Sequence, residues 1–487
     1  MKKQKGKQKI ILFYLKFERM IPNNVSHVTW ELGDALKTLN YNFMVRKMTD
    51  TWRLDVLPSD VLLLIFDYCN EYDLLRLSEV CKRFYEIIRS DVAWVEKSKR
   101  YLATNQATKR FRERCLTILR PRATWRVSYN WHYGIYKKKT IFTRKTRLMP
   151  WLKLSNNILW WCGGNQLVGF NRSDERQLDE LLIEDIYEKD DFYYIEQYTG
   201  GDICKFVLWK NFIICGYTNG TILYFLRKFS EKVEKNKYFI VNGLLNNRSC
   251  VNAIDATSEN VIAGLECGTI KIQRHPDMDR PVYDEEICIR LMDKVQSLSV
   301  NPTATKFAVG SSGISDVSPL HVIDIERYTT VDTMRHAWKH GAGILDMVWD
   351  DPNTLLTCGY DTYIRKWDLR TGKCVCSWAD PTDATLYCIS SDHQYTMVTG
   401  TQYNCLAVLW DQRKSDFVQL YYMTSSSRSS SRCSRSPIYS VQFDNVHLYC
   451  ATDRHVRELN FSETRSKNQK FDYKSLYPSC GLLGSCR

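Results

Sequence analysis

The sequence lacks several features that identify common classes of protein. No window approaches the roughly 20 consecutive apolar residues that a membrane-spanning helix requires. There is no glycine-rich phosphate-binding loop, no histidine-based zinc motif and no nucleophile elbow. The sequence therefore predicts no membrane span, no cofactor and no catalytic residue, and it favours a non-catalytic protein.

The 18 cysteines lack the spacing of a metal site or a disulfide framework. No two of them are separated by the two residues of a zinc knuckle, so we expect no structural metal. Most lie inside apolar runs, as Cys215, Cys358 and Cys450 do, and such cysteines behave as small buried hydrophobes. Scattered thiols of this kind are typical of a reducing compartment, which predicts a cytoplasmic or nuclear protein.

The first 50 residues imitate an export signal without completing it. A lysine-rich start precedes an apolar stretch from Ile10 to Leu15, but Lys16 interrupts that stretch and no small-residue cleavage site follows. Both departures disfavour a signal peptide. We expect residues 1–50 to be a basic, disordered extension. Met48 is an alternative start, which leaves open whether residues 1–47 belong to the mature protein.

Acidic residues are almost absent from the segment between Lys97 and Arg147. It contains 16 Lys or Arg and a single acid, Glu113, whereas the rest of the chain carries a net charge of about −2. The net charge of +13 is therefore local rather than global. We expect residues 101–139 to be a basic linker between two domains.

Residues 51–100 have the patterning of short helices. Pro58, Ser59 and Asp60 form a helix start, with the aspartate favoured by the helix dipole. Two series of apolar residues then recur at spacings of three and four, and Trp94 follows a further cap at Ser90–Asp91. Three short helices make too small a core to be comfortable alone, so such a unit usually leans on a partner.

From residue 148 onward the pattern changes to short apolar strands that repeat. Residues 148–461 fit seven repeats of about 45 residues, the period of a WD-repeat blade. The strand-like stretch Thr140–Leu148 is expected to supply the outermost strand of the last blade and close the ring. The apolar segments of the seven repeats begin at Leu152, Ile203, Val251, Val295, Ile344, Leu386 and Ile438.

The predicted fold is therefore mainly β: a seven-bladed WD-repeat propeller over residues 140–461, preceded by a small all-α domain at 51–100. Two segments interrupt the period, an acidic one at Asn171–Glu196 and a Ser/Arg-rich one at Thr424–Pro437. We expect both to be surface loops, and residues 462–487 to be a disordered tail.

The fifth repeat carries the clearest signature, CGYDTYIRKWDLRTGK. Its polar residues predict a hydrogen-bonded network within the blade, formed by His340, Thr357, Asp361 and Trp367. His340 and Asp361 are also the types of a catalytic dyad, but no nucleophile recurs beside them, which favours the structural role.

Residues 57–94, LPSDVLLLIFDYCNEYDLLRLSEVCKRFYEIIRSDVAW, resemble an F-box along their whole length. An F-box followed by seven WD repeats is the layout of the F-box/WD-repeat family of ubiquitin-ligase receptors. That resemblance implies adaptor-binding roles for a set of apolar residues: Leu57, Pro58, Leu62, Ile65, Phe66, Leu74, Leu77, Val80, Cys81 and Trp94.

The resemblance also implies a function. In such receptors the F-box docks a Skp adaptor, which bridges to a cullin and its RING subunit, while the propeller holds a target protein for ubiquitination and degradation. The chain would then be the substrate-recognition subunit of an SCF-type (Skp–cullin–F-box) E3 ligase and would contribute proximity rather than chemistry.

The target itself is less defined by the sequence. Some relatives read phosphorylated motifs through arginines on the propeller, but the corresponding positions here hold no arginine, which disfavours that design of clamp. Whether a target must be phosphorylated stays open. The weaker candidates for target contact are Tyr217, Tyr360, Tyr387, Tyr439 and Arg454.

An alternative reading is a non-catalytic scaffold that associates with RNA through the basic linker. That segment interleaves its charges with Trp125, Tyr129, Trp131, Tyr133 and Tyr136, and stacking combined with phosphate attraction binds single strands. Packing of these rings between two domains, with the charges in solvent, is the favoured explanation, so we expect no nucleic-acid partner.

Overall fold

A computed structural model describes most of the chain between residues 54 and 462. The described ranges are 54–146, 148–155, 157–172, 192–195, 200–226, 238–241, 249–276, 286–315, 317–334, 336–423 and 436–462. The extension at 1–50, most of the acidic and Ser/Arg-rich insertions and the tail lie outside the described residues. The chain divides into two compact units, one containing residues up to Ser98 together with 120–122, and one containing the remainder.

The first unit is a small helical domain. Its elements are η3 (Leu54–Val56), α3 (Ser59–Asp67), α4 (Glu71–Ser78), α5 (Lys82–Arg89), η4 (Asp91–Trp94) and α6 (Val95–Ser98). Asn70 caps α4, because its side-chain oxygen accepts a hydrogen bond from the Asp73 amide at 2.9 Å. The Phe66 and Phe84 rings meet edge to face at 5.4 Å, which packs α3 against α5.

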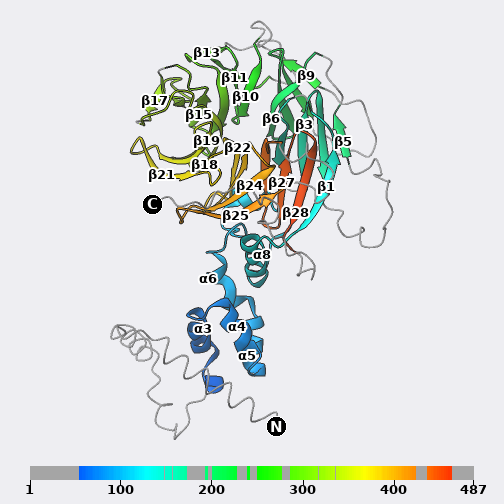
Figure 1. Ribbon diagram of the computed structural model, residues 1–487, viewed down its shortest axis with the longest axis vertical. Coiled ribbons are helices and arrows are strands. Elements are labelled where there is room, and N and C mark those ends of the chain that lie inside the picture. Colours follow the sequence, from blue (N-terminus) through cyan, green and yellow to red (C-terminus); the bar gives the residue numbers. More distant parts are fainter. Residues whose placement is uncertain are drawn as a thin grey trace. The chain divides into compact units, whose positions relative to one another are not determined.

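The second unit is a propeller of seven four-stranded antiparallel sheets, as the repeat period predicted (Figure 1). Along six blades the chain order is also the order of the strands in the sheet. These blades are β2 (Trp151–Leu154), β3 (Ile158–Gly163), β4 (Gln166–Asn171), β5 (Phe192–Ile195); β6 (Ile203–Trp209), β7 (Phe212–Tyr217), β8 (Ile222–Leu226), β9 (Tyr238–Val241); β10 (Val251–Ala256), β11 (Asn260–Leu265), β12 (Thr269–Arg274), β13 (Ile287–Arg290); β14 (Val295–Val300), β15 (Lys306–Ser311), β16 (Leu320–Asp324), β17 (Thr330–Thr333); β18 (Ile344–Asp351), β19 (Thr354–Gly359), β20 (Tyr363–Asp368), β21 (Lys373–Ala379); and β22 (Leu386–Ser391), β23 (Thr396–Thr401), β24 (Leu406–Asp411), β25 (Phe417–Tyr422).

The seventh blade is assembled from two ends of the propeller. It contains β26 (Ser440–Phe443), β27 (His447–Ala451) and β28 (His455–Asn460), and its outer strand is β1 (Lys137–Thr143). The predicted closing strand is therefore present, but it begins three residues earlier than the pattern at Thr140–Leu148 indicated. β1 runs antiparallel to β28, with a bulge at Ile141, whose side chain is buried among blades 1 and 7.

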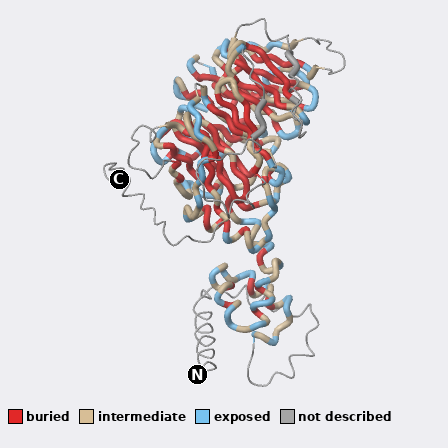
Figure 2. Tube along the Cα trace, turned by 90° about the vertical axis from the view of Figure 1, so that its right-hand side faces the viewer, coloured by how far each residue is buried: buried red, intermediate tan, exposed pale blue. Residues whose placement is uncertain are grey.

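The core of the propeller lies within and between the blades. Buried residues follow the strands of every blade, while exposed residues concentrate on the connections (Figure 2). The first strands of neighbouring blades contact one another all the way round, so they line the centre of the ring. None of the helices among the described residues is long and apolar enough to cross a membrane.

The basic segment expected as a linker is instead part of the propeller unit. It forms α7 (Lys109–Arg112) and α8 (Pro121–Tyr133), and the indole of Trp131 stacks on Phe461 at 3.8 Å. The Trp131 Nε1 also donates to the Asn445 carbonyl at 3.2 Å. Charge density alone suggested a solvated segment, but Thr124, Val127 and Trp131 recur at helical spacing along α8 and give it a buried face that packs on the last blades.

Arginines of this segment reach the turns that follow the first strands of blades 5 and 6. The Arg114 guanidinium donates to the Ser391 carbonyl at 3.1 Å and contacts His393 Nε2 at 2.6 Å. Arg110 donates to the Trp349 carbonyl at 3.0 Å. Main-chain carbonyls therefore satisfy cations that the sequence pattern had assigned to solvent.

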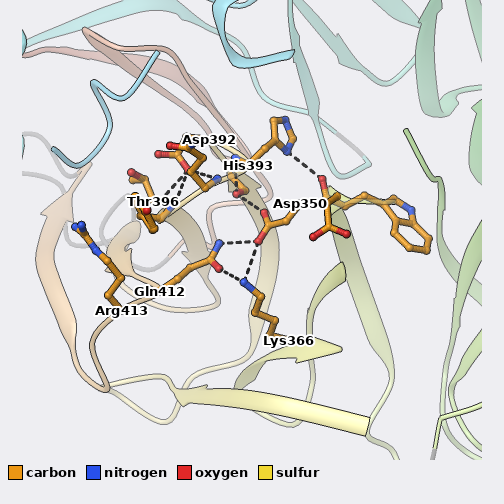
Figure 3. A network of polar contacts seen from close by, with 12 residues as sticks. Asp350, Lys366, Asp392, His393, Thr396, Gln412 and Arg413 are labelled. Atoms are coloured by element: carbon orange, nitrogen blue, oxygen red, sulfur yellow. Dashed lines mark hydrogen bonds and ion pairs between the residues drawn. The ribbon is translucent and has the colours of Figure 1, made fainter. Parts of the chain in front are cut away.

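Those turns also hold a network of polar side chains (Figure 3). Asp350 accepts from Gln412 at 2.8 Å and from Ser391 at 2.8 Å, and it lies 3.6 Å from the Lys366 ammonium. Asp392 accepts from three successive main-chain amides, of which the last belongs to Thr396. His393 Nδ1 contacts the Trp349 carbonyl at 3.0 Å. The network fixes two blades against each other and leaves its histidine enclosed by neighbours.

The predicted signature network forms only in part. Trp367 Nε1 donates to Thr357 Oγ1 at 2.9 Å, and the sixth blade repeats this pair with Trp410 and Thr399. Asp361, however, pairs with Arg365. His340 does not join the network, which corrects the sequence-based prediction.

His340 is exposed because the loop ahead of β18 presents a different aromatic residue to the blade. Trp338 stacks on Trp367 at 5.3 Å, and the ring of His336 meets Trp367 edge-on at 5.6 Å. His340 lies beyond them, in the turn before Gly341, whose φ of +77° belongs to the left-handed region.

Ring closure predicts the effect of shortening Ile141. Ile141→Ala leaves a cavity where β1 meets blade 1, so the free energy of unfolding of the propeller should fall by about 2–5 kcal/mol in denaturant titration. Ile289→Ala, in the half-buried outer strand of blade 3, is the control and should cost less. If both variants lose the same free energy of unfolding, ring closure makes no additional contribution to stability at Ile141.

The position of His393 predicts a pH dependence. Burial and the adjacent Arg114 guanidinium lower the pKa of His393 to about 2, below its unfolded value of about 6.5. As pH falls from about 6.5 toward 2, the unfolded chain binds a proton at this histidine that the folded chain excludes. The free energy of unfolding therefore decreases over this range. Burial raises the pKa of the neighbouring Asp392 to about 6, which acts in the opposite direction as pH falls from about 6 toward 4.

We expect His393→Asn to lose less stability than the wild type between pH 7 and pH 5, measured as the melting temperature of the propeller. Asparagine suits the site because His393 has a φ of +64°, a conformation that asparagine tolerates. His340→Asn, at an exposed histidine of the same unit, should follow the wild-type curve. If the melting temperatures of wild type and His393→Asn fall equally between pH 7 and pH 5, His393 is not the source of the pH dependence.

Candidate docking surfaces of the helical unit and the propeller

The helical unit divides the predicted adaptor-binding residues into a core and a surface. Half of them are fully buried, which corrects their assignment as direct contacts: a side chain with no exposed area supports the surface above it. The buried set is Leu62, Phe66, Leu74, Leu77 and Trp94. Helical periodicity selected them because the same spacing that marks a contact stripe also marks a core.

The remaining predicted residues lie at the surface, where two junctions meet. Leu57 and Pro58 join η3 to α3, while Val80 and Cys81 join α4 to α5. Arg83 ties the two junctions together, because its guanidinium donates to the Asp55 carbonyl at 2.7 Å. Val80 is 43% exposed, and Leu57, Pro58 and Cys81 are partly exposed, as is Ile65 on α3.

The structure adds a residue that the pattern missed. Val56 is 61% exposed beside Leu57, although it falls outside the helical series. We call Val56, Leu57, Pro58, Val80 and Cys81 the junction patch. It offers apolar, partly rigid side chains to solvent on a domain too small to bury them, which is the character of a protein-docking surface. Other exposed apolar residues on this unit include Leu64, Tyr68 and Tyr72.

The propeller presents a second surface where its first strands begin. In five blades the pairing of the first and second strands shifts by one residue at the same place, which marks a β-bulge. The bulge residues are Cys204, Asn252, Gln296, Leu345 and Tyr387. Since the first strands line the centre of the ring, these positions surround one mouth of the central channel.

Tyrosines gather on the part of this mouth formed by blades 5 to 7. Tyr387 and Tyr439 meet edge to face at 5.4 Å, and Tyr360 and Tyr403 rise beside them from the turns that follow β19 and β23. Burial, with the nearby phenols of Tyr360 and Tyr403, raises the pKa of Tyr387. These four residues form the mouth cluster, and three of them were predicted as target contacts.

The other two predicted target contacts fare differently. Tyr217 is only 1% exposed and packs between blades 1 and 2 with Trp151 and Ile203, so its assignment to a binding surface is wrong. It is the last residue of a strand rather than a turn residue. Arg454 lies in the turn between β27 and β28, where its guanidinium is 3.5 Å from the Asp453 carboxylate.

An ion pair spans the channel just inside the mouth. Lys205, next to the bulge in β6, lies 3.6 Å from Asp346 of β18, although these strands belong to blades 2 and 5. The Lys205 ammonium also sits 3.9 Å from the Trp151 ring centre. Because this ion pair crosses the central channel, a macromolecule can contact the rim of the mouth but cannot pass through the channel.

Within the described part of the chain, no group of three or more His, Cys, Asp or Glu residues is placed to hold a metal ion. The alternative RNA surface loses one aromatic residue and one charge to the propeller. Trp131 is buried, and Lys138, which was to supply charge, donates to the Tyr422 carbonyl at 3.2 Å.

Comparison with known proteins agrees with this division. The F-box-like family model matches residues 54–100, the helical unit. F-box/WD repeat-containing protein 4 of mouse is 28% identical to the chain over 413 residues, covering 84% of this chain and 93% of that protein. The human protein of the same name is 28% identical over 413 residues, which cover 84% of this chain and 92% of that protein. The chain thus combines a helical unit that matches the F-box-like model with a seven-bladed propeller, and it is similar to F-box/WD repeat-containing protein 4 along most of its length.

Proposed function

We propose that the chain is the substrate-recognition subunit of an SCF-type E3 ubiquitin ligase. In this proposal the F-box-like unit binds a Skp adaptor, and through it a cullin and RING subunit, while the propeller binds a target protein. The observation that carries the proposal is the junction patch, which leaves Val56 and Val80 in solvent on a domain matched by the F-box-like family.

The physical case for adaptor binding rests on the size of the helical unit. A domain of fewer than 50 residues buries too little apolar surface to be very stable, and further apolar side chains remain outside its core. Covering them with a partner removes that area from water at about 25 cal/mol per Å². The junction patch is compact and held by Arg83, so little entropy is lost on docking.

The case for target binding rests on the mouth cluster. Tyrosine supplies a large contact area at low conformational cost and keeps a hydroxyl for hydrogen bonding, which makes it common at binding hot spots. The cluster is assembled on three blades, and the polar network at the opposite ends of β18 and β22 fixes two of them, blades 5 and 6, against each other. A rigid rim of this kind suits capture of a protein segment, which the ligase would then hold near its charged E2.

Replacing two valines of the junction patch should strongly weaken adaptor capture. In Val56→Ser, Val80→Ser, both exposed apolar side chains become polar without disturbing the buried core. We expect affinity for the Skp adaptor to fall at least about tenfold, or about 1.4 kcal/mol, by titration calorimetry. The Leu57→Ala, Pro58→Ala variant should weaken binding in the same way.

Val375→Ser is the matched control, since Val375 is an exposed valine on the outer strand of blade 5. Its adaptor affinity should equal that of the wild type. The proposal fails if a folded wild-type chain does not bind the adaptor, or if the patch variant binds it as tightly as Val375→Ser does.

The mouth cluster predicts which variants lose the target. Proteins that accumulate on the Val56→Ser, Val80→Ser chain in cells are the target candidates, because that variant can hold but not deliver them. Adding Tyr387→Ser and Tyr439→Ser should reduce their recovery roughly 30-fold, as expected for a hot-spot pair that together contributes about 2 kcal/mol.

Tyr363→Ser provides the control for this experiment. Tyr363 is exposed on β20, the third strand of blade 5, where it lies against Arg365 and two strands outward from the innermost strand β18. Recovery should be unaffected by this change. If Tyr363→Ser lowers recovery as much as the mouth variant does, the mouth cluster is not the target site.

A further inference from the structure

Two cysteines from separate blades meet at the mouth of the propeller. Cys204 is the bulge residue of β6, and Cys250 directly precedes β10. Their sulfur atoms are 3.1 Å apart, although 46 positions separate them in the chain. Both side chains are half-buried, so small reagents in solvent can reach them.

Main-chain hydrogen bonds hold both cysteines in place. The Cys250 carbonyl accepts from the Glu266 amide at 2.9 Å, which anchors it to blade 3. The neighbours of Cys204 are anchored to blades 1 and 2, because Ile203 donates to the Gly164 carbonyl at 2.8 Å and Asp202 accepts from Thr218 at 3.0 Å. The sulfur contact therefore follows from the propeller itself.

This pair differs from the other described cysteines. Cys215, Cys358, Cys388 and Cys450 are fully buried in apolar clusters, where a thiol is inert. The exposed thiol of Cys267 contacts the Thr269 hydroxyl, and that of Cys288 contacts the Glu286 carboxylate. Cys374, two residues from Cys376 on the same strand, contacts its carbonyl rather than its sulfur.

The surroundings also make the two thiols unequal. The hydrogen bond from Cys204 lowers the pKa of the Cys250 thiol, and Lys294 acts in the same direction against burial and Glu266. The same hydrogen bond, with burial, raises the pKa of Cys204. Cys250 is thus the nucleophilic partner and Cys204 the resolving one.

We propose that Cys204 and Cys250 form a reversible disulfide that responds to a low-molecular-weight disulfide such as oxidised glutathione. The Cys250 thiolate attacks one glutathione sulfur and releases the other glutathione as a thiolate. Cys204 then loses its proton and attacks the Cys250 sulfur of the mixed disulfide, releasing the second glutathione. Two protein thiols are oxidised while one glutathione disulfide is reduced to two thiols.

The bond would connect the first strands of blades 2 and 3 at the rim of the channel. It requires the sulfur atoms to approach from 3.1 Å to about 2.05 Å, a small side-chain movement. In the reducing compartment that the cysteine pattern predicts, such bonds are usually transient and redox-sensing. The proposal concerns the propeller alone and does not depend on ligase function.

The full-length chain, first reduced, is equilibrated with reduced and oxidised glutathione at graded ratios, and its thiols are then trapped by alkylation. Tryptic digestion places Cys204 on residues 190–205 and Cys250 on residues 249–271. Mass spectrometry without reduction should reveal these two peptides joined, in a fraction that rises with the proportion of oxidised glutathione and reverses with reductant.

Cys267 shares the second peptide, so Cys267→Ser is the matched control and should leave the cross-link intact. In Cys204→Ser the cross-link should disappear and Cys250 should carry glutathione instead. Should this variant fail to fold, trapping of the wild type still decides the matter. The proposal is overturned if Cys204 and Cys250 stay reduced while exposed Cys288 becomes glutathionylated, or if the cross-link is lost in Cys267→Ser, which would place the bond on Cys267.

Discussion

The propeller depends on the pairing of β1 with β28. This one antiparallel contact joins a strand at residues 137–143 to one at 455–460, and it replaces what would otherwise be two open sheet edges. The segment that delivers β1 is anchored as well, because α8 packs on the last blades and Trp131 stacks on Phe461. The pairing of β1 with β28 thus closes the ring, brings the basic segment against the last blades and positions the mouth.

A closed ring gives a rigid rim, and the two candidate docking surfaces use rigidity differently. On the propeller, bulges repeated in five blades turn one side chain from each blade toward the mouth, so a composite surface arises from residues far apart in sequence. On the helical unit, apolar residues at two helix junctions stay outside a core that is already filled. One unit builds a surface by symmetry, and the other by having more apolar residues than its interior holds.

Repeat length and helical spacing were sufficient to predict the fold, because both reflect how backbone periodicity buries apolar residues. They were insufficient wherever a side chain depends on a partner distant in sequence. Tyr217 was a candidate for target contact and is buried, and His340 matched a motif while Trp338 occupies its expected place. The contact between Cys204 and Cys250 left no local signal, since neither neighbourhood specifies which blade lies next to it.

The pairing of β1 with β28 cannot form until nearly the whole propeller has been synthesised. Synthesis proceeds from the amino terminus, so β1 leaves the ribosome more than 300 residues before its partner β28. At the rate of about 5–20 residues per second, the nascent protein spends tens of seconds as an open row of blades with an unpaired strand at its start. During that interval the exposed edge must be kept from pairing with other chains. Because the ring closes last, the propeller is more susceptible to aggregation during its synthesis than after it has folded.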